Sequence, residues 1–196
     1  MHIYLVRHPP PIDVDGLCYG RLDVAVDEKD IARTAESIFE QIPRQTLASA
    51  RIYCSPSSRC MGVARLIASP RQPTAAEDLI EMSFGHWQGM RWDAIAQLEI
   101  DAWAKDLWGY RPGGGESAEM VATRWEHWLY RVRQSGGGNV VAVTHAGVIR
   151  VALARGGQGS SALEAHIPFG SVHRLDLGMT PDHETTLDHR MRNQHE

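Results

Sequence analysis

The chain has 196 residues, 43% of them hydrophobic and 22% charged, and a formal net charge of −4 at pH 7. A chain of this length buries about 70% of its unfolded surface, so we expect one domain over residues 1–180 and a polar, frayed tail over residues 181–196. The negative charge argues against a nucleic-acid-binding protein, which needs a basic surface. No apolar run approaches the roughly 20 residues of a membrane helix.

The first half of the chain alternates between strand and helix patterns. Residues 3–6 form a short apolar run that predicts a buried strand, and the three prolines at 9–11 end it because proline cannot donate to a ladder. Residues 29–42 show helical spacing of isoleucine and alanine. Residues 51–54 predict a second strand, and the sequence predicts that a helix starts at Ser55-Pro56 and runs to about residue 69.

The second half continues the same alternation around glycine-rich breaks. The predicted elements are a weak strand at 76–82, a helix at 91–108, a loop at 111–115, a helix at 117–133, the strongest strand at 139–144, a helix at 146–154 and a closing strand at 171–177. This order predicts an α/β fold, a three-layer α/β/α sandwich with a largely parallel central sheet. Ligands of such sheets bind beyond the carboxyl ends of the strands.

Two minor features have structural interpretations. The cysteines Cys18, Cys54 and Cys60 lack the spacing of a zinc site and the density of a disulfide scaffold, which favours a reducing, cytoplasmic setting. We expect three small buried hydrophobic residues, with a reactive thiol as the alternative. The N-terminal apolar run is too short for a signal peptide. We expect the tryptophans at 92, 103, 125 and 128 to form core or groove wall rather than base-stacking platforms.

Histidines and arginines gather at the predicted strand ends. Arg7 and His8 follow the first strand, Arg59 follows the second, and His145 follows the strand at 139–144. Two guanidinium forks can hold a tetrahedral dianion bidentately, one neutral imidazole can attack phosphorus, and the other can share the charge on the equatorial oxygens. Each residue alone is more typical of a structural hydrogen bond or a surface ion pair, but their joint position favours a phosphate site.

Five segments carry a family resemblance at this point. LVRHP, CSPSSRC, EMSFGHWQG, PGGGES and VTHAGVIR occur in the order in which similar segments occur in the histidine phosphatase superfamily, also called phosphoglycerate mutase-like. The resemblance implies that His8 is the nucleophile that becomes phosphohistidine and that Arg7, Arg59 and His145 bind the phosphoryl group. It also implies that Glu81 is the acid and then the base; a solvated loop charge is the alternative. No cofactor and no metal are implied.

The opening of the chain suggests a substrate. The segment at 18–23 resembles the α-ribazole phosphatase branch, which removes the 5′-phosphate of α-ribazole phosphate in cobalamin nucleotide-loop assembly. Tyr19, Gly20 and Arg21 would then lie beside the phosphate pocket; an ordinary turn with solvated charges is the alternative. The expected partner is a small-molecule phosphomonoester, and the protein is expected to be a monomer or homodimer. Other possibilities are a broad-specificity phosphatase, a phosphoglycerate mutase, or a catalytically weak phospho-ligand-binding module.

Departures from the family pattern support the last of these. Pro9 stands where the family has glycine, and the prolines remove backbone donors beside His8, so phosphate binding should depend more on side chains. Gln88 replaces a glutamate and cannot act as an acid.

The tail histidines at 183, 189 and 195 are spaced by six and do not share a helix face, so we expect no metal site there.

Overall fold

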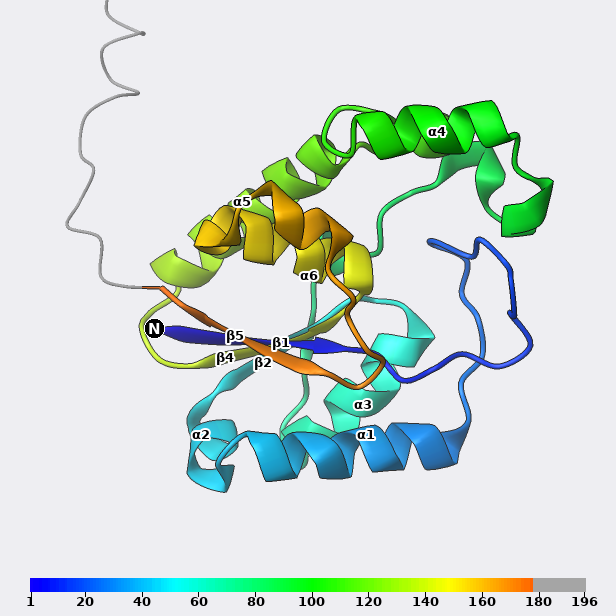
Figure 1. Cartoon of the computed structure of the whole chain (residues 1–196). Coiled ribbons are helices and arrows are strands. Elements are labelled where there is room, and N and C mark those ends of the chain that lie inside the picture. Colours follow the sequence, from blue (N-terminus) through cyan, green and yellow to red (C-terminus); the bar gives the residue numbers. More distant parts are fainter. Residues whose placement is uncertain (178–196) are drawn as a thin grey trace, which may run out of the picture.

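The computed structural model describes residues 1–177 (Figure 1). The end of the predicted domain and the tail over residues 181–196, with its three histidines, lie outside the described residues. Five strands form one sheet in the order β3-β2-β4-β1-β5. Their bounds are β1 His2–Arg7, β2 Arg51–Cys54, β3 Thr74–Ala75, β4 Val140–Thr144 and β5 Val172–Asp176. All neighbouring pairs are parallel except β1 and β5.

Helices cover both faces of the sheet, which confirms the predicted three-layer sandwich (Figure 1). One face carries α1 Glu28–Gln41, α2 Arg44–Ser49 and α3 Ser58–Ala68; the other carries α5 Ala118–Gln134 and α6 Ala146–Leu153. Alternate residues of β4 pack into the two layers: Val141 and Val143 against α1 and α3, and Val140 and Ala142 against α5 and α6. Burial on both faces explains why this strand reads as a continuous apolar run.

The predicted strand at residues 76–82 is wrong. β3 contains only Thr74 and Ala75, and a 3₁₀ turn follows at Glu77–Leu79. The cause is the partner strand: β2 ends at Cys54, and Ala76 makes the last ladder bond to its carbonyl. The sheet therefore offers no partner to the chain beyond that point.

Two predicted helix bounds were also wrong. The helix predicted from Ser55 starts at Ser58, because the Ser55 backbone N–H still donates to Val143 of the sheet. The helix predicted at 91–108 is a 3₁₀ turn at Trp92–Ala94 followed by α4 Gln97–Lys105. The backbone leaves the helical region between the two, with ψ of 136° at Ile95 and 129° at Ala96, and the Ile95 side chain is buried beside Trp87. The short helix α2 was not predicted.

A lobe built around α4 stands beyond the carboxyl ends of the strands (Figure 1). Its first and last turns pack backbone to backbone at Gly85 and Gly113, which both have positive φ. A Cβ atom on Gly85 would lie 2.0 Å from the carbonyl oxygen of Gly113. Glycine is required at both positions for the first and last turns of the lobe to pack together, because no side chain fits between their backbones.

The minor features match their predicted roles. Trp125 and Trp128 are buried in the core. The three cysteines are buried and unbridged, and burial raises the pKa of the Cys18 and Cys54 thiols to about 11. Such thiols are poor nucleophiles at neutral pH. In residues 1–177, none of the helices combines the length and the apolar character that spanning a bilayer requires.

Candidate active site

The carboxyl ends of β1 and β4 bring two histidines together. His8 directly follows β1. His145 directly follows β4 and occupies the N-cap position of α6, without a side-chain capping bond. Because the two strands are parallel neighbours, the imidazole rings meet edge to face with centroids 5.1 Å apart. The His8 backbone N–H donates to the Thr144 carbonyl at 3.1 Å and fixes this register.

The His8 side chain is held in one tautomer. Its Nδ1 lies 2.7 Å from the Pro9 carbonyl oxygen, which can only accept, so Nδ1 carries the proton and Nε2 holds the lone pair. The side chain is 1% exposed, and burial together with the neighbouring charge of Arg59 lowers the pKa of His8 to about 3. The imidazole is neutral at neutral pH, which a nucleophile requires.

His145 is neutral as well. Burial, the neighbouring His8 and the charge of Arg59 hold its pKa well below the usual value for histidine. Its Nε2 lies 2.8 Å from Ser55 Oγ and 3.5 Å from Cys60 Sγ. The neutral ring can supply a hydrogen bond to a bound oxyanion but not a full charge.

Two arginines surround the histidines. Arg59 is fully buried in the first turn of α3, and its Nη atoms donate to the Leu22 and Gly20 carbonyls at 2.8 Å each. Arg7 Nη1 donates to the Ile167 carbonyl, and the guanidinium carbon lies 3.6 Å from the centroid of the Phe169 ring. Neither Nε has a hydrogen-bond partner among the described residues, although both are buried. Buried donors without a partner are rare, and an oxyanion is one group that would satisfy them.

The last part of the described chain covers this corner. Residues before β5 lead past Arg7, and the Gly170 backbone N–H lies 3.1 Å from the Arg7 carbonyl and 3.3 Å from that of His8. Phe169 also contacts His8, with ring centroids 5.6 Å apart. Sequence reasoning missed this segment, because its apolar residues carry no motif.

Glu81 lies where the lobe joins the sheet and is 8% exposed. One carboxylate oxygen accepts from the Met82 backbone N–H at 2.8 Å, and the other accepts from Gly147 at 3.4 Å. Burial lowers the pKa of Arg7, and attraction to Tyr19 and to this carboxylate opposes that shift. The carboxyl group therefore has backbone donors but no direct ion pair among the described residues.

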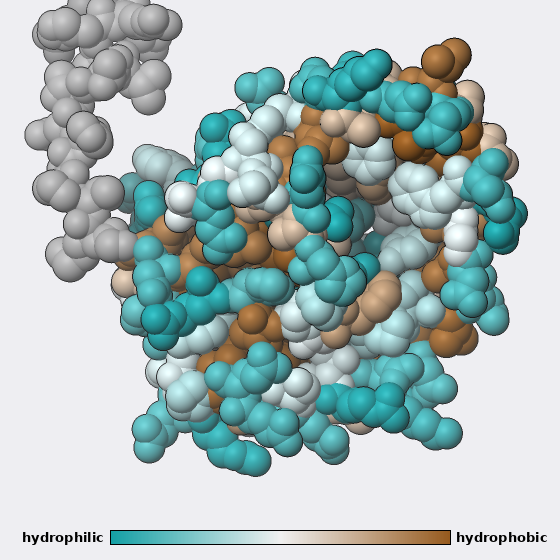
Figure 2. Space-filling model, viewed as in Figure 1, coloured by the Kyte–Doolittle hydropathy of each residue, from teal (hydrophilic) through white to brown (hydrophobic). Residues whose placement is uncertain are grey.

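A pocket of about 270 Å³ lies between the lobe and α6, where Figure 2 shows the surface hollowed. Arg7 and Glu81 line it, and so do Tyr19 and Gly20 of the predicted substrate segment. His8, Arg59 and His145 are fully buried and are not among its lining residues. The pocket therefore reaches the arginine and the carboxylate, with the two histidines deeper in the molecule.

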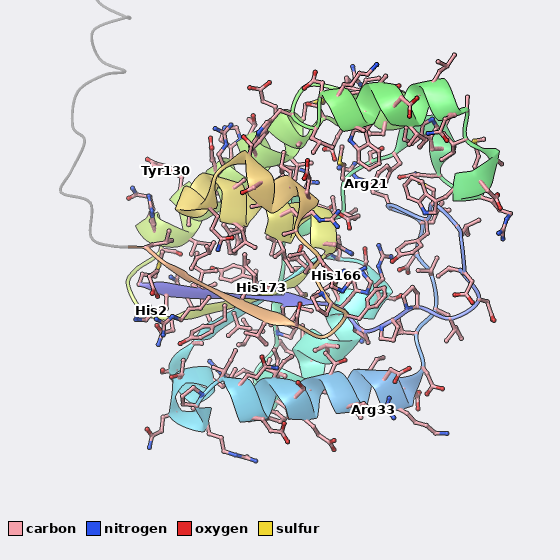
Figure 3. All side chains as sticks on the ribbon, in the orientation of Figure 1. His2, Arg21, Arg33, Tyr130, His166 and His173 are labelled. Carbon is pink, nitrogen blue, oxygen red and sulfur yellow. The ribbon has the colours of Figure 1, made fainter. Side chains whose placement is uncertain are left out.

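The pocket walls differ in chemistry. Trp92 and Trp103 stack nearly parallel, with an interplanar angle of 11° and centroids 6.3 Å apart, and form an aromatic wall as the sequence predicted. The other wall carries Arg150 and His166, which sequence reasoning missed although Arg150 ends the VTHAGVIR segment. His166 is labelled in Figure 3.

Two further predicted positions have structural contacts. Arg21, labelled in Figure 3, does not line the pocket. Its guanidinium binds the Glu81 carbonyl and the Glu116 carboxylate. Gln88 accepts hydrogen bonds through Oε1 from two backbone N–H groups, those of Arg21 and Phe84. Within residues 1–177, histidine, cysteine and carboxylate side chains form no group of three that could hold a metal ion.

Comparison with known proteins adds a family and a fold. The family model described as "Histidine phosphatase superfamily (branch 1)" matches residues 3–185. The metal-independent phosphoserine phosphatase of Arabidopsis thaliana is 30% identical over 169 residues, which cover 82% of this chain and 70% of the relative.

Solved structures agree with the sandwich. The α-ribazole phosphatase of Shigella flexneri superimposes with a TM-score of 0.77 at 24% identity, covering 91% of this chain and 92% of that one. The phosphoglycerate mutase of Thermus thermophilus gives a TM-score of 0.70 at 23% identity, covering 91% and 94%. The expected phosphoglycerate mutase-like fold is confirmed.

Proposed function

Since the chain belongs to the histidine phosphatase superfamily, we propose that it hydrolyses phosphomonoesters through a phosphohistidine formed on His8. The Nε2 lone pair attacks phosphorus, and the bond between phosphorus and the ester oxygen breaks. Glu81 gives its proton to the departing alkoxide. Glu81 then takes a proton from water, the hydroxide displaces His8 from phosphorus, and inorganic phosphate leaves. Arginine supplies the positive charge, so the proposed reaction needs no metal.

The state of His8 carries this proposal. A buried, neutral imidazole with its proton held on Nδ1 by Pro9 leaves Nε2 free to attack. The unpartnered Nε donors of Arg7 and Arg59 support an oxyanion beside it. Proline at position 9, which departs from the family pattern, is compatible with this state, because the bond to His8 uses the carbonyl group that proline retains.

We propose α-ribazole 5′-phosphate as the substrate. The stacked pair of Trp92 and Trp103 suits an aromatic base attached to the sugar. The segment with Tyr19 and Gly20, which resembles that branch, lines the same pocket. The reaction would belong to cobalamin nucleotide-loop assembly.

A small phosphomonoester that bears a carboxylate is the second candidate, and Arg150 favours it. Arg150 lines the pocket, and its Nε donates to the Ala165 carbonyl at 2.9 Å. Among the described residues it has no carboxylate partner. A carboxylate of the substrate would fit it in bidentate fashion. Phosphoserine, named in the Arabidopsis relative, belongs to this class.

Rapid-quench trapping tests the mechanism. Wild type mixed with a labelled phosphomonoester should carry acid-labile, base-stable phosphate, and His8→Ala should carry none and show no turnover. The matched control is His86→Ala, since the His86 side chain is 65% exposed. Substantial turnover by His8→Ala would overthrow the nucleophile. If wild type turned over no phosphomonoester, the enzyme proposal would fail and the catalytically weak phospho-ligand-binding module would be the remaining alternative.

A panel of substrates tests which alcohol carries the phosphate. Wild type and Arg150→Met should be compared on α-ribazole 5′-phosphate, phosphoserine and p-nitrophenyl phosphate. If Arg150→Met loses activity selectively on phosphoserine, the substrate is a phosphomonoester that bears a carboxylate. If kcat/KM is highest on α-ribazole 5′-phosphate and is unchanged in Arg150→Met, the substrate is α-ribazole 5′-phosphate. Burst kinetics with 2,3-bisphosphoglycerate distinguish a mutase.

A further inference from the structure

The segment that carries Glu81 lacks regular secondary structure beyond its 3₁₀ turn, yet side chains from outside the segment bind its backbone polar groups. They are Arg124 on the Asp78 carbonyl, Thr144 on the Leu79 carbonyl at 2.7 Å, Arg21 on the Glu81 carbonyl at 2.9 Å, Glu116 on the Ser83 N–H at 3.0 Å and Gln88 on the Phe84 N–H at 3.2 Å. Side chains thus replace the sheet ladder that ended at β3.

Glu116 is the centre of this arrangement. Its Oε1 lies 2.8 Å from Arg21 Nη2 and 3.2 Å from Arg124 Nε. Its Oε2 accepts from Arg124 Nη2 at 3.2 Å and from the Ser83 backbone N–H at 3.0 Å. The carboxylate therefore joins Arg124, which binds the Asp78 carbonyl at the start of the segment, to Arg21, which binds the Glu81 carbonyl, and it also binds the segment itself.

The electrostatics keep this group ionised. Glu116 is only 14% exposed, and burial alone would raise its pKa. The Arg124 guanidinium, the Ser83 N–H and the Arg21 charge outweigh burial and hold the pKa of the carboxyl below its usual value. An ion pair with two arginines and a backbone bond is geometrically restrictive, because each oxygen has two donors.

The side chain of Glu81 depends on that backbone for its position. Among the described residues, its oxygens accept only from the N–H groups of Met82 and Gly147. No side chain of the described residues grips the carboxylate directly. Movement of the 78–84 backbone would therefore move the carboxyl group at the pocket wall, and displacement of about 1 Å can cost a catalytic group about 100-fold in rate.

We propose that Glu116, through Arg21 and Arg124, is the positioning residue of the acid Glu81. This inference rests on the proposed function. It gives the PGGGES segment a role, since Glu116 is its acidic residue. It also gives Arg21 and Gln88 a role in holding Glu81 in place. The amide oxygen of Gln88 accepts from the backbone N–H groups of Arg21 and Phe84, as a carboxylate oxygen would.

The test is a double-mutant cycle on two leaving groups. Glu116→Gln keeps the size but places an amide N–H₂ against an arginine. We expect its kcat/KM, which reports only the steps up to release of the alcohol, to fall about 10- to 100-fold on glycerol 2-phosphate. On p-nitrophenyl phosphate it should fall less than about 3-fold, because p-nitrophenolate leaves without a proton. In a Glu81→Gln background the same change should have almost no further effect on either substrate.

The control is Glu126→Gln, which breaks another glutamate–arginine pair, with Arg155, on the exposed surface. Glu126→Gln should leave kcat/KM unchanged on both substrates. Equal losses of kcat/KM on both leaving groups in Glu116→Gln, or a loss that adds in full to that of Glu81→Gln, would overturn the proposal. Because Glu116→Gln can lower stability, Arg21→Lys is the second variant; its single ammonium cannot reach both the Glu81 carbonyl and Glu116, and it should show the same leaving-group dependence.

Amide hydrogen exchange separates this inference from the proposed function. In Glu116→Gln the Met82 and Ser83 amides should exchange faster while α1 and β4 stay protected. Unchanged exchange at both amides would overturn the positioning role even if wild type hydrolyses phosphomonoesters. Faster exchange would support the structural step even in a protein without turnover, where only the proposed function would fail.

Discussion

Replacing His8 by asparagine should make the protein less sensitive to acid. In the folded protein burial and Arg59 lower the pKa of His8 to about 3, whereas an unfolded histidine titrates near 6.5. As pH falls from about 6.5 toward 3, the unfolded chain takes up a proton that the folded chain refuses, so the free energy of unfolding falls. The slope is about 1.4 kcal/mol per pH unit from this residue alone, on the order of 5 kcal/mol across the whole window.

His8→Asn is suitable because its side-chain amide can still donate to the Pro9 carbonyl. Urea unfolding at several pH values between 7 and 4 gives the free energies. We expect the stability difference between wild type and variant to shift by roughly 3 kcal/mol in favour of the variant from pH 6 to pH 4. The carboxylates and the distant histidines titrate in both proteins and cancel, and His86→Asn should run parallel to wild type. The pKa of His145, which the neighbouring His8 helps to lower, rises in His8→Asn and adds to the shift in favour of the variant. Parallel curves for His8→Asn would refute a depressed pKa and with it the neutral nucleophile at low pH.

Three further outcomes are expected. Gly85→Ala should lower the free energy of unfolding by several kcal/mol, measured by thermal melting, because it combines a positive φ with a clash against the Gly113 carbonyl; a change under about 1 kcal/mol would mean that the lobe rearranges. Trp103→Ala should raise the KM for α-ribazole 5′-phosphate roughly 10-fold more than that for phosphoserine, and an equal rise would remove the aromatic subsite. Gln88→Glu should leave kcat on both leaving groups within about 2-fold of wild type, whereas a large gain would show that the amide limits the acid.

The sandwich could be predicted because its causes are local. Val140 to Val143 are buried on both faces, and a continuous apolar run after a glycine-rich break is typical of such a strand. The strand expected at 76–82 failed because pairing depends on a partner, and β2 ends before that segment begins. Local patterns do not report where a neighbouring strand stops.

The positions of the candidate catalytic residues were predictable, but their contacts were not. Arg7, His8 and His145 stand at strand ends as expected. The contacts of Arg59 with the Gly20 and Leu22 carbonyls depend on a loop from another part of the chain. The role proposed for Glu116 could not be predicted for the same reason. It depends on a contact with Arg21, which is distant in sequence and adjacent only after folding.

The segment that covers Arg7 has a consequence for the order of assembly. The residues that pack against Arg7 and His8 are Ile167, Phe169 and Gly170, which are among the last of the described residues to be synthesised. Their strand, β5, pairs with the first strand of the molecule. During translation Arg7 and His8 therefore remain without this cover until residues 167–176 have left the ribosome.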